Sequence, residues 1–574
     1  MTGKTTEDRK ADDLMSLCKR RGFIWPSFEL YGGIAGMYDY GPLGFNMRNN
    51  IVSVWRDIYK GREGFCEIDS ETVNPREVFK ASGHVDKFAD KITYCTKCNA
   101  PFRADHLVKQ YYANPDTMSE KELDQAFLDH NVVCPDCGGK LGPVEDFNLM
   151  FRTNIGPGSA RVGYLRPETA QGIFVNFLNL YRYNREKLPL GVLQTGRGYR
   201  NEIAPRQGMI RMREFNMMEV ELFVDPNDKS WCRFKDMKDE ELTLLPNTGD
   251  DMVKMTVGEA VRNKVIANEV LGYFVGTTKQ FLVRLGVDPA RLRFRQHRKE
   301  EMAHYAKDCW DAEALLSYGW TEITGIADRG CWDLSRHSQF SGADLSHFKR
   351  FDEPREEEIE KIKANQKNLG PSFKGQAKDV AAALEAKTPA DVKDGQLTVT
   401  VNGKAITVGS EMFSVTKVKE KVSGERVIPN VIEPSHGLDR IFYTVLEHAY
   451  SYDQAKDYTV LHLQPEIAPV KLGVFPLMEK DGLDEVAKQI CAAVHSAQAE
   501  AYYDGAGTIG KRYARMDEIG TPWCVTVDYD TLSGPQKDTV TIRDRDTTAQ
   551  KRIAIRDLPT TLESLLAGKA FADL

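Results

Sequence analysis

The sequence predicts an α+β protein, with a sheet flanked by helices and interrupted by insertions, followed by a separate C-terminal α/β domain. Residues 192–224 alternate like two strands joined by a loop, and residues 427–450 read as a strand followed by a helix. From about residue 457, strand and helix patterns alternate to the end. A chain of 574 residues is too long for one core, so we expect domains at 1–456 and 457–574. The expected insertions in the first domain lie at about 95–145, 230–310 and 345–425.

The composition is that of a soluble globular protein. Hydrophobic residues make up 41% of the chain, charged residues 28%, and the net charge is -7, so a nucleic-acid partner must be met by local basic patches. The 11 cysteines are few and odd in number, which favours a reducing compartment without disulfides. The sequence contains no run of eighteen apolar residues, so we expect no membrane span. The first residues resemble neither a signal peptide nor a transit peptide. The cytosol is the expected location, and an additional organellar pool stays open.

The second strand of residues 192–224 has two faces of different chemistry, because side chains two residues apart share a face. Its even positions include four apolar residues that suit a core: Met212, Met218, Val220 and Leu222. Its odd positions carry cations, an aromatic ring, a thioether and carboxylates: Arg211, Arg213, Phe215, Met217, Glu219 and Glu221.

The first strand of this pair leaves room for a ligand close to the backbone. Gly196, Gly198, Arg200 and Glu202 fall on one face. An arginine and an aromatic ring four residues apart on a strand lie ~13 Å apart, which suits the phosphate and base of a bent nucleotide. The alternative is an ordinary solvated sheet face. No Gly-rich phosphate loop occurs at a strand-to-helix junction, so a nucleotide would have to be held by these arginines.

A second candidate ligand site lies where the strand of residues 427–450 meets its helix. The strand ends at Glu433–Pro434–Ser435, and the helix begins after Gly437. Arg440 lies in the first helical turn, where a cation is unfavourable to the helix dipole. An anionic ligand explains this arginine better than stability does. Glu168 also lies at the start of a predicted helix, where the dipole alone is a sufficient explanation.

Two CxxC pairs have the ligand type and spacing of a structural zinc site, with a longer gap between the pairs than in compact zinc ribbons. The alternatives are a knuckle that has kept its cysteines without metal, and unpaired buried thiols. Four thiolates leave no open coordination position, so a metal here would be structural. The four residues are Cys95, Cys98, Cys134 and Cys137.

Periodicity assigns four further segments. Residues 43–60 and 258–285 have helical spacing, and residues 351–395 read as charged, exposed helices. Residues 397–407 read as a hairpin that turns at Asn402–Gly403. The basic stretch 291–301 is either an RNA-facing patch or the solvated face of a helix.

Six short motifs together resemble one family over essentially the whole chain. The motifs are FRADHL, RPETAQGIF, YRNE, IRMREFNMME, GIADR and EPSHGLDR, and a helix–strand–proline element precedes them. They are similar to motifs 1, 2 and 3 of class II aminoacyl-tRNA synthetases, and in detail to homodimeric glycyl-tRNA synthetases. The class I signatures HIGH and KMSKS are absent.

The resemblance implies an antiparallel sheet, dimerisation through motif 1, and condensation of glycine with ATP before transfer to tRNA(Gly). Arg200 would hold the α-phosphate, Glu202 the adenine amino group, and Phe215 would stack on adenine. Arg211 and Arg440 would hold the outer phosphates, with magnesium. The whole implied ATP site is Arg200, Asn201, Glu202, Ile210, Arg211, Arg213, Phe215, Glu322, Ile323, Gly437 and Arg440.

The resemblance also implies a glycine site, in which carboxylates meet the ammonium group and an arginine meets the carboxylate. The implied residues are Arg103, Glu168, Phe215, Glu219, Arg329, Glu433 and Ser435. No general base is needed, because a carboxylate attacks phosphorus and the protein aligns the reactants. We therefore expect His436 to be a bystander, Asp439 either to orient Arg440 or to cap the helix, and Glu221 to have no assigned role.

The C-terminal domain resembles the anticodon-binding domain of this family. Lys511, Arg512 and Arg515 are candidates for phosphate contact or, alternatively, part of a solvated face. Two other functions stay open at this point. One is a class II synthetase for serine or threonine, and the other is a non-catalytic RNA-binding paralogue.

Overall fold

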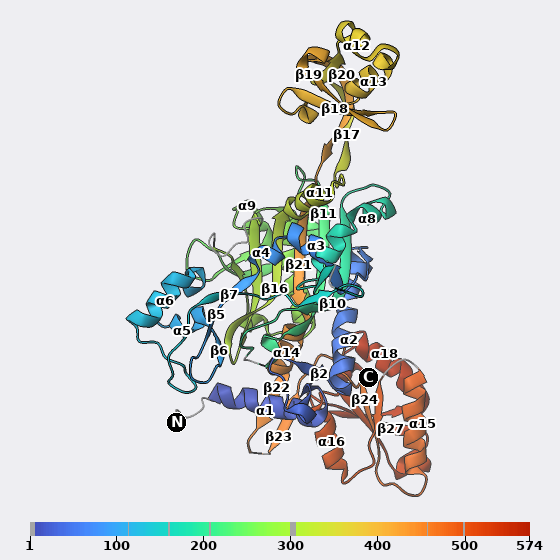
Figure 1. Ribbon diagram of the computed structural model, residues 1–574. Helices are drawn as coiled ribbons and strands as arrows, with labels where there is room; N and C mark the ends of the chain where they lie inside the picture. The colour runs from blue at the N-terminus through green and yellow to red at the C-terminus, as the bar shows by residue number, and fades with distance from the viewer. Residues whose placement is uncertain are drawn as a thin grey trace. The chain divides into compact units, whose positions relative to one another are not determined.

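The computed structural model describes residues 6–574 except 113, 159–160, 206–207, 299–305, 456 and 497–499 (Figure 1). The chain divides into two compact units, residues 1–345 with 429–574 and residues 346–428. Among the described residues, no helix is both long enough and apolar enough to cross a bilayer.

A nine-stranded sheet organises the first unit. All neighbouring strands are antiparallel except two pairs, β12 with β14 and β10 with β3. In spatial order the strands are β13 (Val253–Thr256), β12 (Glu241–Leu245), β14 (Leu292–Gln296), β15 (Asp308–Leu316), β16 (Gly319–Gly330), β21 (Asn430–Gly437), β11 (Glu214–Val224), β10 (Leu190–Tyr199) and β3 (Cys66–Glu67).

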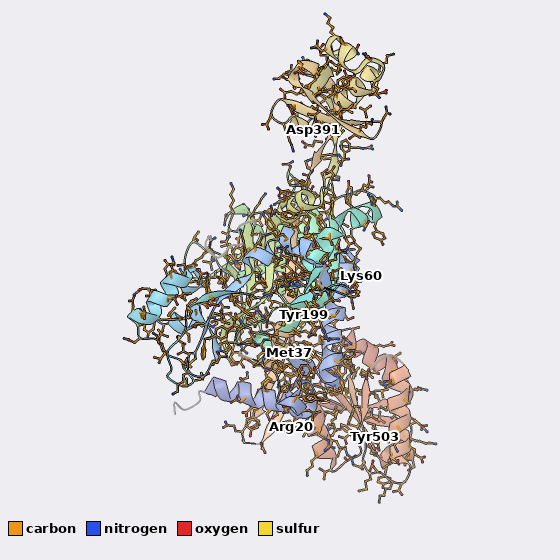
Figure 2. The ribbon with its side chains drawn as sticks, in the orientation of Figure 1. Arg20, Met37, Lys60, Tyr199, Asp391 and Tyr503 are labelled. Carbon is orange, nitrogen blue, oxygen red and sulfur yellow. The ribbon has the colours of Figure 1, made fainter. Side chains whose placement is uncertain are left out.

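The predicted strand pair of residues 192–224 is the antiparallel pair β10 and β11, in which Tyr199, labelled in Figure 2, lies opposite Glu214. The apolar side chains at the even positions of β11 are buried in the core, as predicted. The second strand begins at Glu214 rather than at Arg211. The Arg213 amide instead bonds to the Gly36 carbonyl at 2.8 Å, while the Arg213 carbonyl still accepts from the Arg200 amide at 2.9 Å.

Helices cover the apolar face of this sheet and share its core: α1 (Thr6–Arg21), α2 (Pro42–Arg56), α9 (Val257–Arg262), α10 (Glu269–Arg284) and α14 (Leu438–Ala449). The predicted helix at 43–60 is α2, continued by a π-helix at Asp57–Arg62. The predicted helix at 258–285 is broken in two. Lys264 adopts a positive φ of 58°, and the Asn268 side chain caps α10 by accepting from the Leu271 amide at 3.0 Å.

Short elements cover the polar face of the sheet. They are β4 (Val73–Pro75), α3 (Arg76–Ala81), α4 (His84–Lys87), β8 (Arg152–Asn154), β9 (Val162–Leu165), α7 (Ala170–Val175), α8 (Phe177–Tyr183) and α11 (Trp332–Ser341). A separate cluster holds the cysteine pairs and consists of β5 (Ala89–Tyr94), β6 (Pro101–Arg103), α5 (Ala104–Val108), α6 (Glu120–Asp129) and β7 (Glu145–Asn148). Strands β1 (Ile24–Pro26) and β2 (Tyr38–Tyr40) pair with each other.

The C-terminal part has the predicted α/β alternation around a five-stranded sheet of order β25-β24-β26-β27-β28. The strands are β24 (Leu472–Pro476), β25 (Ala501–Tyr503), β26 (Trp523–Val527), β27 (Thr539–Asp544) and β28 (Gln550–Ala554), and the helices are α15 (Leu483–Ser496), α16 (Ile509–Glu518), α17 (Tyr529–Leu532) and α18 (Leu558–Leu566). A hairpin of β22 (Tyr450–Asp453) and β23 (Tyr458–Leu461) precedes it. Arg21 binds Glu518 with Nε–Oε2 at 2.6 Å, and Phe475 and Met516 join the core shared with the large sheet.

The second unit, residues 346–428, has its own small core. Its elements are β17 (His347–Ala364), α12 (Gln366–Phe373), α13 (Ala377–Glu385), β18 (Gln396–Val401), β19 (Lys404–Gly409) and β20 (Phe413–Val427). The predicted hairpin is β18–β19, and Asn402 and Gly403 both have positive φ at its turn. The prediction of helix from residue 351 is wrong up to Ala364. There β17 pairs with β20 and sets Glu358 opposite Lys419 and Glu360 opposite Lys417, so its charges are satisfied across strands.

Candidate active site

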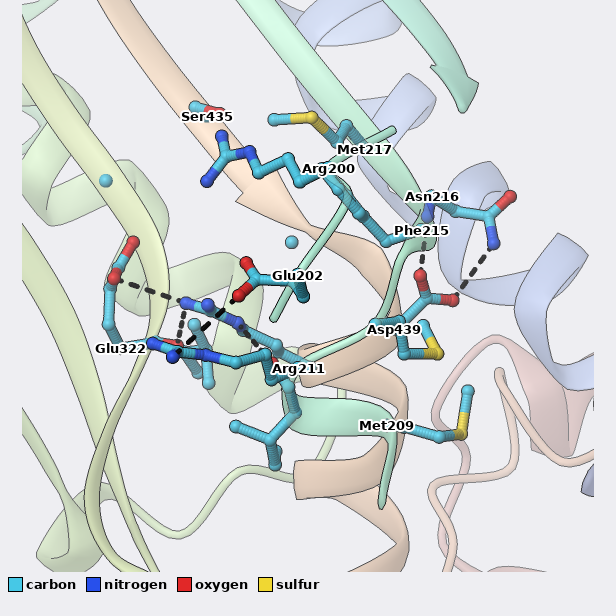
Figure 3. A pocket seen from close by; sticks show the side chains of 16 residues that line it. Arg200, Glu202, Met209, Arg211, Phe215, Asn216, Met217, Glu322, Ser435 and Asp439 are labelled. Atoms are coloured by element: carbon cyan, nitrogen blue, oxygen red, sulfur yellow. Dashed lines mark hydrogen bonds and ion pairs between the residues drawn. The ribbon is translucent and has the colours of Figure 1, made fainter. Parts of the chain in front are cut away.

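A pocket opens on the polar face of the large sheet, between β11, β16, β21 and the start of α14 (Figure 3). Most of the residues predicted for ATP lie in its wall. The lining residues are Arg200, Glu202, Met209, Ile210, Arg211, Met212, Phe215, Asn216, Met217, Glu322, Ile323, Gly325, Ser435, Gly437, Asp439 and Arg440. Asn201 and Arg213 are the two predicted ATP residues that the structure does not place in this wall.

Three arginines bring positive charge into the pocket. The Arg200 guanidinium lies 5.2 Å from the centre of the Phe215 ring. Arg440 approaches Glu322 at 3.2 Å and donates to the Ile210 carbonyl at 3.0 Å. Arg211 points toward Glu202 (Figure 3), with its Nη1 3.9 Å from a Glu202 oxygen. This arrangement offers cations to an anion and a ring face to a base.

Arg440 favours the ionised form of Glu322. The positive charge of its guanidinium lowers the pKa of that carboxyl. Arg213 has a different task, because its Nε donates to the Glu202 carbonyl at 3.1 Å and its Nη1 to the Ala35 carbonyl at 2.8 Å. Arg213 thus ties the loop before β11 to residues 35–36.

The carboxylates predicted for glycine gather beside this pocket, where β11 and β21 meet. Glu219 is 1% exposed and accepts from the Thr169 amide at 2.7 Å, from the Thr169 hydroxyl, and from the Ser435 hydroxyl at 3.0 Å. Burial and then the nearby Glu168 raise the pKa of Glu219. Register explains the grouping, because Glu219 lies directly opposite Ser435.

Arg329 is the buried cation among these acids. Its Nη1 donates to Glu433 at 2.9 Å, and its Nε and Nη2 donate to Asp333 at 2.8 and 3.0 Å. Glu168 lies 3.9 Å from Arg329 and 3.7 Å from the His84 ring. Burial raises the pKa of Glu433 to about 7 despite Arg329. For Glu168, burial opposes ionisation, but His84 and Arg329 outweigh it and lower the pKa.

Predicted site residue Arg103 lies apart from this group. It ends β6 and is held by Asp90 at 3.0 Å and by Asp105 at 2.8 Å. It does not line the pocket. Four residues that support the acids were not singled out from the sequence: His84, Thr169, Gln171 and Asp333. Thr169 and Gln171 lie within the RPETAQ motif, and Asp333 lies four residues after Arg329, so the sequence pointed to these three residues. No pattern in the sequence pointed to His84.

The expectations for Asp439 were wrong. The Asp439 carboxylate neither contacts Arg440 nor caps α14. It accepts from the Asn216 amide, from the Asn216 side chain at 3.0 Å, and from the Tyr40 hydroxyl. Burial raises its pKa. Asp439 therefore joins β2, β11 and α14 at the pocket edge.

His436 lies on the opposite face of β21 from the pocket acids. It is fully buried, and its ring packs against Trp55, Tyr59 and Phe281. Burial lowers its pKa to about 3. His436 is therefore part of the core on the face of the sheet opposite the pocket.

The four cysteines of the CxxC pairs come together. The sulfur of Cys95 lies 3.5 Å from that of Cys137, and the sulfur of Cys98 lies 3.7 Å from that of Cys134. All four sulfurs lie within 4.8 Å of one another. A side chain on Gly139 would come within 2.9 Å of the Cys95 sulfur, so the chain needs glycine there.

The helix alternative for the basic stretch 291–301 is wrong for its described part. Residues 292–296 form the strand β14 instead of a helix. Arg293 binds Glu313 at 2.7 Å and Arg295 binds Asp311 at 3.0 Å, because β15 sets these acids directly opposite. These cations are engaged within the sheet. Residues 299–301 lie outside the described chain.

Two of the three basic residues predicted to contact RNA in the C-terminal part serve its fold. Arg512 is 3% exposed and donates to the Gly507 carbonyl at 2.8 Å and to the carbonyls of Pro476 and Gly505. Arg515 binds Asp504 at 2.7 Å. Lys511, in contrast, is exposed.

Comparison with known proteins agrees with this geometry. Residues 158–449 match the model of the tRNA synthetase class II core domain (G, H, P, S and T), and residues 471–565 match that of the anticodon binding domain. Two solved structures of prolyl-tRNA synthetase from Cryptosporidium parvum have the same fold at 12% identity. They show TM-scores of 0.50 and 0.51, cover 97% of this chain, and are themselves covered over 78% and 75%.

Curated relatives are far more similar in sequence. The glycine–tRNA ligase of Methanothrix thermoacetophila is 48% identical over 97% of both chains, and that of Methanocaldococcus jannaschii is 48% identical over 97% of this chain and 99% of its own. The glycine–tRNA ligase of Archaeoglobus fulgidus is 46% identical over 97% of both. With this coverage and the pocket described above, the chain belongs to the glycine–tRNA ligase family of class II aminoacyl-tRNA synthetases.

Proposed function

We propose that this protein is a glycine–tRNA ligase that activates glycine with ATP and transfers the glycyl group to the 3′ end of tRNA(Gly) for translation. The observation that carries the proposal is the meeting of two sites on one sheet face. Glu219, Glu433 and Arg329 gather beside a pocket that Arg200 and Arg440 make positive. The near full-length identity to glycine–tRNA ligases supports the same reaction.

The pocket suits ATP through cations at one wall and an aromatic ring at another. Arg200 would bind the α-phosphate, Phe215 would stack on adenine and Glu202 would accept from its amino group. Arg211 and Arg440 would bind the outer phosphates bidentately. Arg213 would contribute indirectly, by holding the loop before β11 in place. The complete set proposed for ATP is Arg200, Asn201, Glu202, Ile210, Arg211, Arg213, Phe215, Glu322, Ile323, Gly437 and Arg440.

The acid cluster suits the two charges of free glycine. Glu168, Glu219 and Glu433 would surround the ammonium group, and Ser435 would add a hydroxyl. Arg329 would turn toward the carboxylate. Buried carboxylates favour a cation, and a bound ammonium supplies it. Phe215 would border both substrates, and Arg103 stays in the proposal on the motif match alone.

Alignment and charge neutralisation are sufficient for the first step. A glycine carboxylate oxygen attacks the α-phosphorus, the bond from that phosphorus to the bridging oxygen breaks, and pyrophosphate leaves. Arg200 would stabilise the charge on the α-phosphoryl oxygens. Magnesium, when bound to the outer phosphates, neutralises their charge, and the Glu322 carboxylate in the pocket wall is the oxygen type that it prefers. In the second step a ribose hydroxyl attacks the glycyl carbonyl and AMP leaves.

Size exclusion would make the site specific for glycine. Thr169 and Ser435 bind Glu219 from two sides of the proposed glycine site. The ion pair of Arg329 with Asp333 closes another side of that site. A side chain on the substrate would have to displace these buried groups. Sterics can therefore reject larger amino acids without editing.

The cysteine cluster suits a structural zinc ion. The sulfur–sulfur distances of 3.5 and 3.7 Å approach the ~3.8 Å that a tetrahedron with Zn–S bonds of about 2.3 Å requires. The Lys97 and Cys98 amides point at the Cys95 sulfur at 3.4 and 3.5 Å, as donors to a thiolate would. Zinc would fix the arrangement of β5, β6 and β7.

We also propose that residues 1–456 form a catalytic domain and residues 457–574 an anticodon-binding domain. Two copies of the chain would form a homodimer in the cytosol. The helix–strand element that resembles motif 1 is α2 followed by β3, and β3 is an edge strand of the large sheet. An edge strand is a ready surface for a second copy. Light scattering should give twice the chain mass of 64.8 kDa.

Charging of tRNA by the purified protein tests the proposal. Radiolabelled glycine should become acid-precipitable with a tRNA(Gly) transcript and ATP, and a tRNA(Ser) transcript is the control. Arg200→Ala should abolish charging while tRNA binding persists. Charging of the control with serine, or full activity of Arg200→Ala, would overturn the assignment.

A further inference from the structure

One buried acid beside the glycine site has no task in the reaction described above. Glu221 lies on β11, two residues after Glu219 and on the same face of the strand. It is 0% exposed. In the described part of the chain, neither of its carboxylate oxygens has a hydrogen-bond partner. A buried polar group in this state is costly unless something satisfies it.

The sheet register identifies what faces Glu221. Because β11 pairs Glu219 with Ser435 and Leu222 with Ile432, Glu221 lies opposite Glu433 on β21. Side chains directly opposite each other on antiparallel strands have Cβ atoms about 4.5–5.5 Å apart. The other charged groups around Glu221 are Glu219 on the same strand, Arg329 on β16 and Asp333 on α11.

These neighbours cannot hold Glu221 as an anion. Arg329 is the cation of the group, and it already donates to Glu433 and, through two nitrogens, to Asp333. Burial and then the charge of Glu433 raise the pKa of Glu221 well above its ordinary value. A protonated carboxyl, in contrast, brings one O–H donor to a face crowded with acceptors.

We propose that Glu221 is a positioning residue for glycine binding: it is a neutral carboxylic acid that donates its O–H to Glu433 and so orients that carboxylate toward the glycine ammonium. This inference rests on the proposed function, because it takes Glu433 as a glycine ligand. It gives β11 two different acids, Glu219, which meets the substrate, and an uncharged Glu221 beside it on the same face of the strand.

A purely structural role predicts a different response to substitution. Replacing a buried, poorly satisfied carboxyl by leucine of similar length should leave stability unchanged or raise it. If Glu221 only filled space, Glu221→Leu would therefore be harmless. If it orients Glu433, Glu221→Leu should weaken glycine binding even in a stable protein, and Glu221→Gln, which keeps a neutral donor, should restore it.

Infrared spectroscopy tests the protonation state without relying on catalysis. The wild-type protein at pH 7.5 should show a protonated-carboxyl C=O band that Glu221→Gln lacks. Glu447→Gln is the matched control, since Glu447 is also buried, at 1% exposed, but accepts from the Ser317 amide at 2.7 Å. An unchanged band in Glu221→Gln would overturn the inference.

Steady-state kinetics test the orientation. In glycine-dependent pyrophosphate exchange, Glu221→Leu should raise KM for glycine on the order of tenfold, the loss of one hydrogen bond to a charged group, with KM for ATP unchanged. Glu221→Gln should stay within about threefold of wild type. Wild-type KM for glycine in Glu221→Leu would contradict the inference. If the wild-type protein shows no exchange with glycine, the proposed function fails, whereas the infrared result still decides the protonation of Glu221.

Discussion

Arg329 and Glu433 lie on neighbouring strands of the large sheet, and the guanidinium donates to the carboxylate at 2.9 Å. The same guanidinium holds Asp333 through two further bonds. One planar group thus connects β16, β21 and α11 at the centre of the proposed glycine site. A lysine at this position carries the charge but lacks the planar fork that binds Asp333 through two nitrogens and Glu433 through the third.

Arg329→Lys should therefore lose glycine binding selectively. We expect KM for glycine to rise at least tenfold, because two directed charge-assisted bonds are lost, and KM for ATP to change less than twofold. Pyrophosphate exchange with each substrate varied in turn measures both. Arg336→Lys, on the same helix as Asp333, is the control and should behave as wild type. Equal loss for both substrates would argue against a glycine-specific role.

Glycine binding should release protons at mildly acidic pH. Burial raises the pKa of Glu433 to about 7, so below that pH the residue binds a proton in the free protein. An ammonium ion favours the ionised carboxylate and expels this proton. KM for glycine should rise as pH falls from 7.5 to 6. Calorimetry at pH 6.5 in buffers of different ionisation enthalpy should detect proton release in wild type and much less in Glu433→Gln.

Asp439 should matter for stability and for ATP more than for glycine. Asp439→Asn replaces an oxygen that accepts from the Asn216 amide by a group that donates, so we expect a loss of about 1–3 kcal/mol in the free energy of unfolding. Tyr40→Phe removes a single donor and should cost less. Urea unfolding followed by fluorescence measures both losses. An Asn variant as stable as wild type would contradict the role of Asp439 as a tie between strands.

Zinc should be bound in a ratio of one per chain. Cys95→Ser should remove the metal and lower the melting temperature, since a structural site of four thiolates contributes directly to folding. Elemental analysis and thermal unfolding provide the measurements. Cys491→Ser in the C-terminal part should retain the metal. If the wild-type protein contains no zinc after purification without chelator, the proposal of a structural zinc site is wrong.

Lys511 and Arg512 are neighbours on α16, but we expect one to affect tRNA binding and the other the stability of the protein. Lys511→Ala should weaken tRNA binding with no change in melting temperature, because the side chain is exposed. Arg512→Ala should destabilise the protein, because it leaves buried carbonyls such as that of Gly507 without a donor. Filter binding and thermal unfolding distinguish the two. Equal effects in both assays would show that α16 is not divided in this way.

Local patterns predicted the parts of the site that lie on regular strands. The alternation along β11 placed Phe215, Glu219 and Glu221 on one face, and the turn at Asn402–Gly403 followed from its backbone requirement. The family resemblance, rather than periodicity, brought Glu168, Arg329 and Glu433 into one site, because strands distant in sequence meet only through sheet order.

The wrong predictions for charged residues share a physical cause. The sequence shows which residues are charged but not which groups they contact in the folded chain. The charged run at 351–364 has a composition typical of helix, yet β20 sets lysines opposite Glu356, Glu358 and Glu360. Arg295 and Arg512 read as free cations, but tertiary structure sets an aspartate and three carbonyls against them. Asp439 was expected to act on the adjacent arginine, whereas its partner lies on another strand.

Amino-acid-dependent pyrophosphate exchange tests the central claim most directly. With ATP, magnesium and labelled pyrophosphate, the protein should exchange label with glycine and fall to background with alanine, serine and threonine, because in the proposed site a substrate side chain would have to displace Thr169, Ser435 or Arg329. Exchange with serine or threonine and none with glycine would contradict the account.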